Sequence, residues 1–185
     1  ISLHEPYLKE TNSLEYLKDC IDSGWISSNG KWVNEFENRI CDFTGAKYAV
    51  AVVNCTSGLR LALHIAGVEQ FEEVLMPPLT FIASANAVSH LKAIPHFVDI
   101  EKERLGICPS KLKERLEEIA IMKDGKVYNK QTNRKISAIL PVHVFGKSAK
   151  IYEIKSIADK WGLKVIEDAA ESLGSWYSIN EKWIH

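Results

Sequence analysis

The feature that most constrains the fold is an alternation, from residue 46 onward, of short apolar runs with longer amphipathic segments. The runs have the length and composition of buried strands. Apolar strands separated by helices are typical of a parallel sheet covered on both faces. We therefore predict an α/β, doubly wound fold with mainly parallel strands and helices on both faces. The expected strands are 47–53, 74–76, 94–98, 136–142 and 163–166, and the expected helices follow the turn at 54–58 and occupy 80–91, 109–120 and 148–161.

The chain divides in this prediction into an N-terminal helical segment, 1–45, and an α/β core, 46–185. Apolar spacing after an extended start predicts one helix that ends at Ser23-Gly24 and a second that ends at Thr44-Gly45. The loop 25–30 between them is either an ordinary helix connection or a substrate contact.

A polar insertion at 122–135 interrupts the alternation. Its Asp124-Gly125 pair is typical of a tight hairpin turn, and a second polar turn follows. We predict a small exposed hairpin here and assign it no chemistry.

The composition argues against several classes of protein. Lys and Arg total 23 and Asp and Glu total 24, so the net charge is -1 and no basic surface for nucleic acid or an anionic membrane stands out. No apolar segment is long enough to span a bilayer and no signal-peptide pattern is present, so we expect a cytoplasmic protein. The four cysteines form no Cys-x-x-Cys pair, which argues against a zinc site and a disulfide framework.

The stretch 163–174 places a carboxylate at the end of a buried strand. Its apolar start stops at Glu167-Asp168, and small residues follow. Ligands of open α/β sheets bind beyond the carboxyl ends of the strands, which makes Asp168 a candidate ligand-binding residue. A second interpretation is open, because Asp168 and Glu171 also have the spacing of a capping box at the start of a helix.

Other candidates follow other strands, and each has a structural alternative. Thr56 and Ser57 begin a helix directly after a strand, where they can bind a phosphate or merely cap the helix. Phe81 can stack on a flat ring or belong to the core. His143 can react or simply be hydrogen-bonded within the fold. Neither Gly-x-Gly-x-x-Gly nor Gly-Lys-Ser/Thr is present, which argues against dinucleotides and nucleoside triphosphates.

The candidates gain weight together, because the ends of parallel strands meet at one edge of the sheet. A phosphate site, a ring-stacking aromatic and a buried carboxylate are what pyridoxal 5'-phosphate (PLP) requires. The carboxylate keeps the pyridine nitrogen protonated, the aromatic fixes the ring plane and the helix terminus binds the phosphate. We therefore expect PLP as the cofactor.

Four segments in the same order along the chain resemble the DegT-type nucleotide-sugar aminotransferases, which have fold-type I of the PLP-dependent enzymes. The resemblance implies that 1–185 is the N-terminal part of the large, PLP-binding domain. Two further segments, 3–6 and 24–28, look most like the branch that acts on 4-keto sugars in legionaminic-acid-like pathways. The four segments are 49–63, 77–87, 141–146 and 167–174.

The resemblance also implies roles for individual residues. Thr56 and Ser57 would bind the cofactor phosphate, Phe81 would stack on the ring, Asp168 would pair with the pyridine nitrogen and Glu171 would approach the ring hydroxyl. His143 would lie near the cofactor. One position departs from the family, which commonly has Gly where this chain has Cys55, and a Cβ there alters the space for the phosphate.

A larger departure is an absence. The Schiff-base lysine of the family follows the Asp motif by a further strand and loop, in a Ser-Phe-x-x-x-Lys type of context, and is expected beyond His185. Lys182 follows Asp168 too closely to be that residue. No catalytic residue is therefore expected within this chain and the small C-terminal domain is missing, so we expect the truncated chain to be inactive alone.

The implied function is transfer of an amino group, from glutamate in our expectation, to a keto-sugar nucleotide in the biosynthesis of cell-surface polysaccharide or nonulosonic acid. A PLP-dependent sugar dehydratase, with histidine in place of the lysine, is one alternative. A non-catalytic remnant used for binding or dimerisation is another. The family implies a homodimer for the full-length protein.

Overall fold

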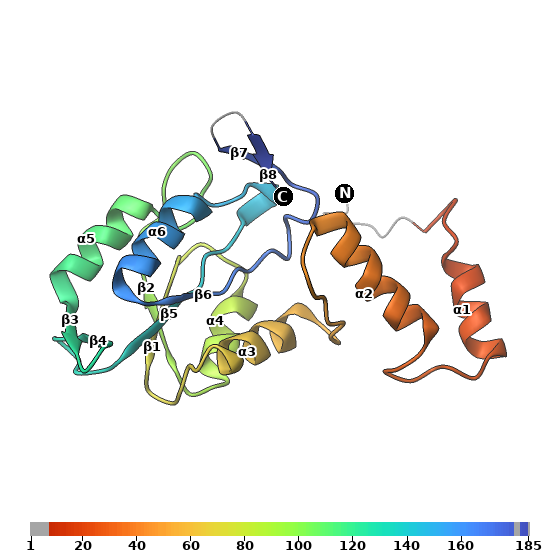
Figure 1. The fold of residues 1–185 in the computed structure, drawn as a ribbon, viewed down its shortest axis with the longest axis horizontal. Coiled ribbons are helices and arrows are strands. Elements are labelled where there is room, and N and C mark those ends of the chain that lie inside the picture. The colour runs from red at the N-terminus through yellow and green to blue at the C-terminus, as the bar shows by residue number, and fades with distance from the viewer. Residues whose placement is uncertain (1–7, 180–181, 185) are drawn as a thin grey trace. The chain divides into compact units, whose positions relative to one another are not determined.

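The computed structural model describes residues 8–179 and 182–184, and the chain divides into two compact units, Ile1–Ala51 and Val52–His185 (Figure 1). The extended start predicted before the first helix lies outside the described residues. Among the residues described, no helix is both long enough and apolar enough to cross a membrane.

The first unit contains the two predicted helices, α1 (Ser13–Asp22) and α2 (Lys31–Thr44). Each is followed by a glycine in the left-handed region, Gly24 with φ 72° and Gly45 with φ 71°, as predicted for helix ends. The indole N–H of Trp32 donates to Asp19 at 2.7 Å and joins the start of α2 to α1. The segment 25–30 connects the two helices.

The second unit is built on the predicted parallel sheet. Its strand order is β2-β1-β5-β6, and every neighbouring pair is parallel. All four residues of β1 are buried, because this central strand is covered on both faces. The strands are β1 (Glu73–Met76), β2 (Ile94–Phe97), β5 (Ile136–Ile139) and β6 (Lys164–Val165).

Two hydrophobic clusters cover opposite faces of this sheet. Leu75 and Ile139 point into one cluster with α5 (Pro109–Ile119) and α6 (Ile151–Trp161). Their neighbours Val74, Met76 and Ala138 point into the other, with α3 (Cys55–Ile65) and α4 (Ile82–Ser89). Figure 1 shows the two helix pairs on opposite sides of the sheet. Successive side chains along β1 and β5 therefore enter the two clusters in turn.

The predicted strand 47–53 is wrong. No described residue pairs with it, and its apolar side chains Tyr48, Val50 and Val53 are exposed. The backbone N–H of Ala51 instead donates to the carboxylate of Glu37 at 2.7 Å. An alternating sequence becomes a strand only where a neighbouring strand accepts its backbone hydrogen bonds.

The predicted hairpin is confirmed as β3 (Ala120–Lys123) and β4 (Lys126–Asn129). Asp124 and Gly125 both have positive φ, as a tight hairpin turn requires. The expectation that the hairpin is simply exposed is wrong, because Val127 and Asn129 are buried. A further hairpin, β7 (Tyr177–Ile179) and β8 (Lys182–Ile184), lies at the end of the chain.

The buried carboxylate of Glu73 joins the β3–β4 hairpin to the amino end of the sheet through hydrogen bonds. It accepts hydrogen bonds from Asn129 at 2.9 Å, Thr132 at 2.6 Å and His96 at 2.8 Å. Arg115 donates to the other ring nitrogen of His96 at 3.1 Å, so the proton of a neutral His96 lies on the side of Glu73. Burial raises the pKa of Glu73, but these hydrogen bonds together outweigh burial and hold the pKa below its ordinary value.

Replacing Glu73 should destabilise the fold strongly. Glu73→Ala should lower the free energy of unfolding by about 2–4 kcal/mol, because it leaves the buried Asn129 and the partly buried His96 without their acceptor. Glu114→Ala, which removes an exposed ion pair, should change this free energy by less than about 1 kcal/mol. Urea unfolding of the three proteins measures the difference.

The lowered pKa also gives the sign of the pH dependence. The stabilisation by Glu73 is present above the pKa of an unfolded Glu, about 4.3, and is lost as the pH falls through the folded pKa. Glu73→Ala should therefore lose less stability than the wild type over that acidic range. Equal losses in the two proteins, or a neutral-pH effect as small as that of Glu114→Ala, would contradict this role.

Candidate active site

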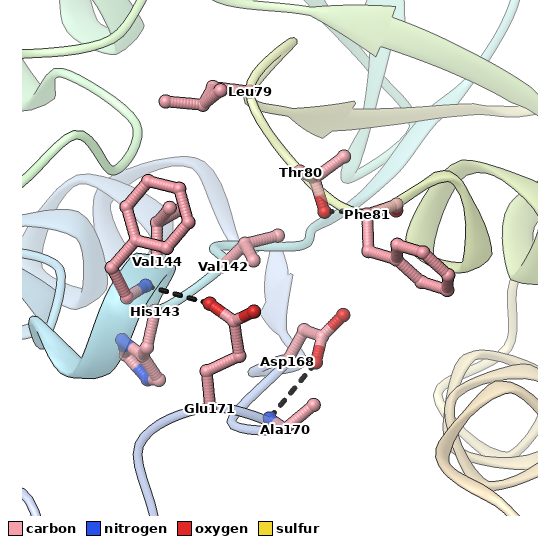
Figure 2. Close-up of a pocket in the computed structure, with 10 residues that line it drawn as sticks. Leu79, Thr80, Phe81, Val142, His143, Val144, Asp168, Ala170 and Glu171 are labelled. Atoms are coloured by element: carbon pink, nitrogen blue, oxygen red, sulfur yellow. Dashed lines mark hydrogen bonds between the residues drawn. The ribbon is translucent and has the colours of Figure 1, made fainter. Parts of the chain in front are cut away.

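A pocket of about 310 Å³ lies at the carboxyl edge of the sheet (Figure 2). Its walls come from three segments that follow β1, β5 and β6. This convergence is what the parallel topology predicts. The lining residues are Leu79, Thr80, Phe81, Val142, His143, Val144, Phe145, Asp168, Ala170 and Glu171.

Asp168 is fixed at this edge by its backbone. It pairs in parallel register with Val142, since its N–H donates to Pro141 at 2.9 Å and its carbonyl accepts from His143 at 3.0 Å. Its side chain is buried with 6% exposed. The predicted position of Asp168 at a strand end is therefore confirmed.

Three groups donate to the Asp168 carboxylate. The hydroxyl of Ser84 donates to Oδ2 at 2.6 Å. The backbone N–H of Ala170 donates to Oδ1 at 3.2 Å, and the thiol of Cys55 lies 3.7 Å from the same oxygen. One strong donor thus holds Oδ2, whereas Oδ1 has two longer contacts.

The capping-box interpretation of Asp168 and Glu171 is wrong. The chain turns at 170–174 without forming a helix. Glu171 accepts instead from the backbone N–H of Phe145 at 2.7 Å, a bond drawn in Figure 2. Phe145 has φ 53° and ψ 40°, a left-handed conformation uncommon for a residue with a side chain. The Glu171 carboxylate thus joins the turns after β5 and β6.

His143 has the hydrogen-bonded structural role considered from the sequence. It is buried, and its Nδ1 accepts from the backbone N–H of Ala149 at 2.9 Å. Because a backbone N–H can only donate, a neutral His143 carries its proton on Nε2, which lies 3.0 Å from a carboxylate oxygen of Glu167. Both ring nitrogens are occupied while the side chain lines the pocket.

Phe81 is not a core residue, since 77% of its surface is exposed. It is the N-cap residue of α4 and lines the pocket. The structure therefore contradicts the core alternative for this residue. Ring stacking stays a prediction.

Thr56 and Ser57 do not line this pocket. The side chain of Asn54 accepts from the N–H of Ser57 at 2.9 Å, which is the N-cap expected of a helix start. The preceding residue Cys55 nevertheless contacts Asp168, so the N-terminus of α3 lies beside the site. The roles of Thr56 and Ser57 in phosphate binding stay predictions.

The sequence analysis missed Ser84, a fully buried residue that donates to Asp168. The available signal was a hydroxyl residue among alanines in a short apolar helix, four positions after Thr80. No group of three or more His, Cys, Asp or Glu that could hold a metal ion occurs among the described side chains.

The reactivity of Cys55 should report the charge of Asp168. Burial, the negative charge of Asp168 and the hydrogen bond to it raise the pKa of the Cys55 thiol. Asp168→Asn removes that charge and should increase alkylation of Cys55 by iodoacetamide at pH 8 by roughly two- to tenfold. Peptide mass spectrometry measures the alkylation of Cys55 relative to that of Cys108, the internal reference.

The control is Asp159→Asn, on the exposed face of α6, which should leave this ratio unchanged. An unchanged ratio in Asp168→Asn would refute the coupling.

Comparisons with known proteins give consistent relatives for this chain. It is 35% identical over 182 residues to GDP-perosamine synthase from Vibrio cholerae, covering 98% of this chain and 44% of the relative. It is 37% identical over 164 residues to the spore coat polysaccharide biosynthesis protein SpsC from Bacillus subtilis, covering 89% and 38%. The chain thus spans less than half the length of these relatives.

The fold matches solved structures as well. NtdA from Bacillus subtilis with bound cofactor PMP superposes with a TM-score of 0.74 at 28% identity, over 87% of this chain and 33% of that one. 3-Amino-5-hydroxybenzoic acid synthase gives 0.75 at 28% identity, over 92% and 41%. A family model matches residues 8–181, and the chain therefore belongs to the DegT/DnrJ/EryC1/StrS aminotransferase family.

Proposed function

We propose that this chain is the N-terminal part of the cofactor-binding domain of a sugar aminotransferase, and that its pocket binds PLP. The Asp168 carboxylate carries the proposal, because it is buried, held by hydrogen bonds and part of the pocket at the carboxyl edge of the sheet. Its similarity to a GDP-perosamine synthase and to a structure with bound PMP supports it.

The donor set around Asp168 fits a protonated pyridine. A buried carboxylate with two weak contacts on Oδ1 retains the capacity to accept a further hydrogen bond from a cationic N–H. When bound, PLP supplies a protonated ring that withdraws electrons from the carbon bearing the amino group. Asp168 would hold that ring proton at the nitrogen.

The start of α3 would hold the phosphate. The thiol of Cys55 contacts Asp168, and Thr56 and Ser57 are the next two residues in the sequence. The start of α3 therefore lies beside the carboxylate. Since Asn54 accepts from the N–H of Ser57, the groups we assign are the two hydroxyls and the N–H of Thr56. The helix dipole adds to the attraction for an anion.

The remaining pocket residues would orient the ring. Phe81 has an exposed aromatic side chain available for stacking. Glu171 has one carboxylate oxygen fixed by Phe145, and we assign the other to the ring hydroxyl. His143, with both nitrogens occupied, would form a rigid wall rather than transfer protons.

The complete protein would use an amino donor, glutamate in our proposal, and a keto-sugar nucleotide, and it would act as a homodimer. The family's Schiff-base lysine has no match within these 185 residues. A lysine at that place in a longer polypeptide would give an aminotransferase, whereas histidine would give a dehydratase.

Cofactor binding can be tested directly on this chain. Pyridoxamine 5'-phosphate (PMP) is the better probe, because it has no aldehyde and forms no imines with surface lysines. Asp168→Asn should weaken PMP binding by roughly 10- to 100-fold, which corresponds to loss of a charge-assisted hydrogen bond. Equilibrium dialysis with PMP fluorescence measures the dissociation constant. Asp159→Asn is the matched control, and equal affinities of wild type and Asp168→Asn would refute the proposed site.

The isolated polypeptide should be catalytically inactive. With PLP, glutamate and keto-sugar nucleotides supplied, it should form no amino sugar above the level without protein, because it lacks the lysine that serves as base. Mass spectrometry of the sugar product measures this. Amino transfer that exceeds the protein-free control would show that the 185 residues suffice.

A further inference from the structure

We propose that Ser84, supported by Thr80, is a positioning residue that fixes the orientation of the Asp168 carboxylate toward the pyridine nitrogen of the cofactor. The inference rests on the proposed function. It adds two residues to which neither the sequence nor the relatives give a role.

Ser84 is the strongest partner of the carboxylate. Its side chain is fully buried in α4, and its Oγ lies 2.6 Å from Oδ2 of Asp168, which is 84 positions away in the sequence. A buried hydroxyl at this distance from an ionised group forms a charge-assisted hydrogen bond, stronger than one between neutral groups. The bond restricts rotation of the carboxylate.

The donor and acceptor in each hydrogen bond among Thr80, Ser84 and Asp168 follow from the number of hydroxyl hydrogens. Ser84 has one hydroxyl hydrogen, and an ionised Asp168 can only accept. Ser84 therefore donates to Asp168. The single hydroxyl hydrogen of Thr80 has two acceptors within reach, the hydroxyl of Ser84 at 2.6 Å and the carbonyl of Phe81 at 3.2 Å, and we assign it to the shorter contact. Thr80 is thus oriented toward Ser84 and polarises the hydroxyl that holds the carboxylate.

The two carboxylate oxygens consequently differ. Oδ2 is held by the short bond from Ser84, whereas Oδ1 has only the N–H of Ala170 at 3.2 Å and the thiol of Cys55 at 3.7 Å. Each carboxylate oxygen can accept two hydrogen bonds, so these three donors leave the Asp168 carboxylate able to accept one more. We assign this remaining capacity to the ring N–H.

The test compares two ligands that differ only at the ring nitrogen. One is PMP, and the other is its carbocyclic analogue, in which a C–H group replaces that nitrogen. The wild type should bind PMP more tightly than the analogue, because only PMP reaches Asp168 through its ring. Ser84→Ala should reduce this preference by roughly three- to tenfold.

The ratio of the two affinities separates positioning from a structural role. If Ser84→Ala only loosened the fold, both ligands would lose affinity equally and the ratio would stay constant. Ser89→Ala, the same change on the exposed side of α4, should leave the ratio unchanged. In an Asp168→Asn background, Ser84→Ala should add no further change, since Ser84 acts through the charge of that carboxylate.

Each outcome decides between the claims. A wild type without preference for PMP would overturn both the ring contact and this inference, whereas a wild-type preference that Ser84→Ala retains would overturn the inference alone. If Ser84→Ala fails to fold, Thr80→Val, which preserves shape at a half-buried position, replaces it and should reduce the preference in the same direction. An unchanged preference in Thr80→Val would then refute the role of the hydroxyl chain.

Discussion

The second unit depends on burial of its central strands from both sides. In β1 and β5, successive side chains enter two separate hydrophobic clusters, one beneath α5 and α6 and the other beneath α3 and α4. Neither helix pair could be removed without exposing every second residue of these strands to water. The same constraint fixes the strand direction, since the crossover helices return the chain to the same end of the sheet, and the candidate groups that follow β1, β5 and β6 therefore gather at one edge.

Two buried carboxylates stand at opposite ends of this sheet, and their surroundings differ in a way that bears on function. Glu73 at the amino end accepts short hydrogen bonds on both oxygens from three side chains, and it does not line the pocket. Asp168 at the carboxyl end is held firmly on one oxygen and weakly on the other. Glu73 therefore holds the structure together, whereas Asp168 lines the pocket, where its carboxylate can meet a ligand.

The turns that form the pocket are held by side chains rather than by regular structure. Glu171 accepts from the backbone of Phe145, and His143 links the segment after β5 to Ala149 and Glu167. These contacts replace the hydrogen bonds that a helix after Asp168 would have provided. They leave Phe81 and the carboxylates of Asp168 and Glu171 on the wall of the pocket, where they can meet a ligand.

Local and periodic features of the fold could be predicted from the sequence. The alternation of apolar strands and helices predicted the parallel sheet, glycines marked the ends of α1 and α2, and the carboxylate after β6 was recognised as a ligand candidate, since each signal depends on residues close together in the chain. The tertiary structure alone decided the pairing of Ser84 with Asp168 and of Glu73 with Asn129, and it left 47–53 without a partner strand. Those outcomes depend on which distant segments meet, and no local pattern encodes that information.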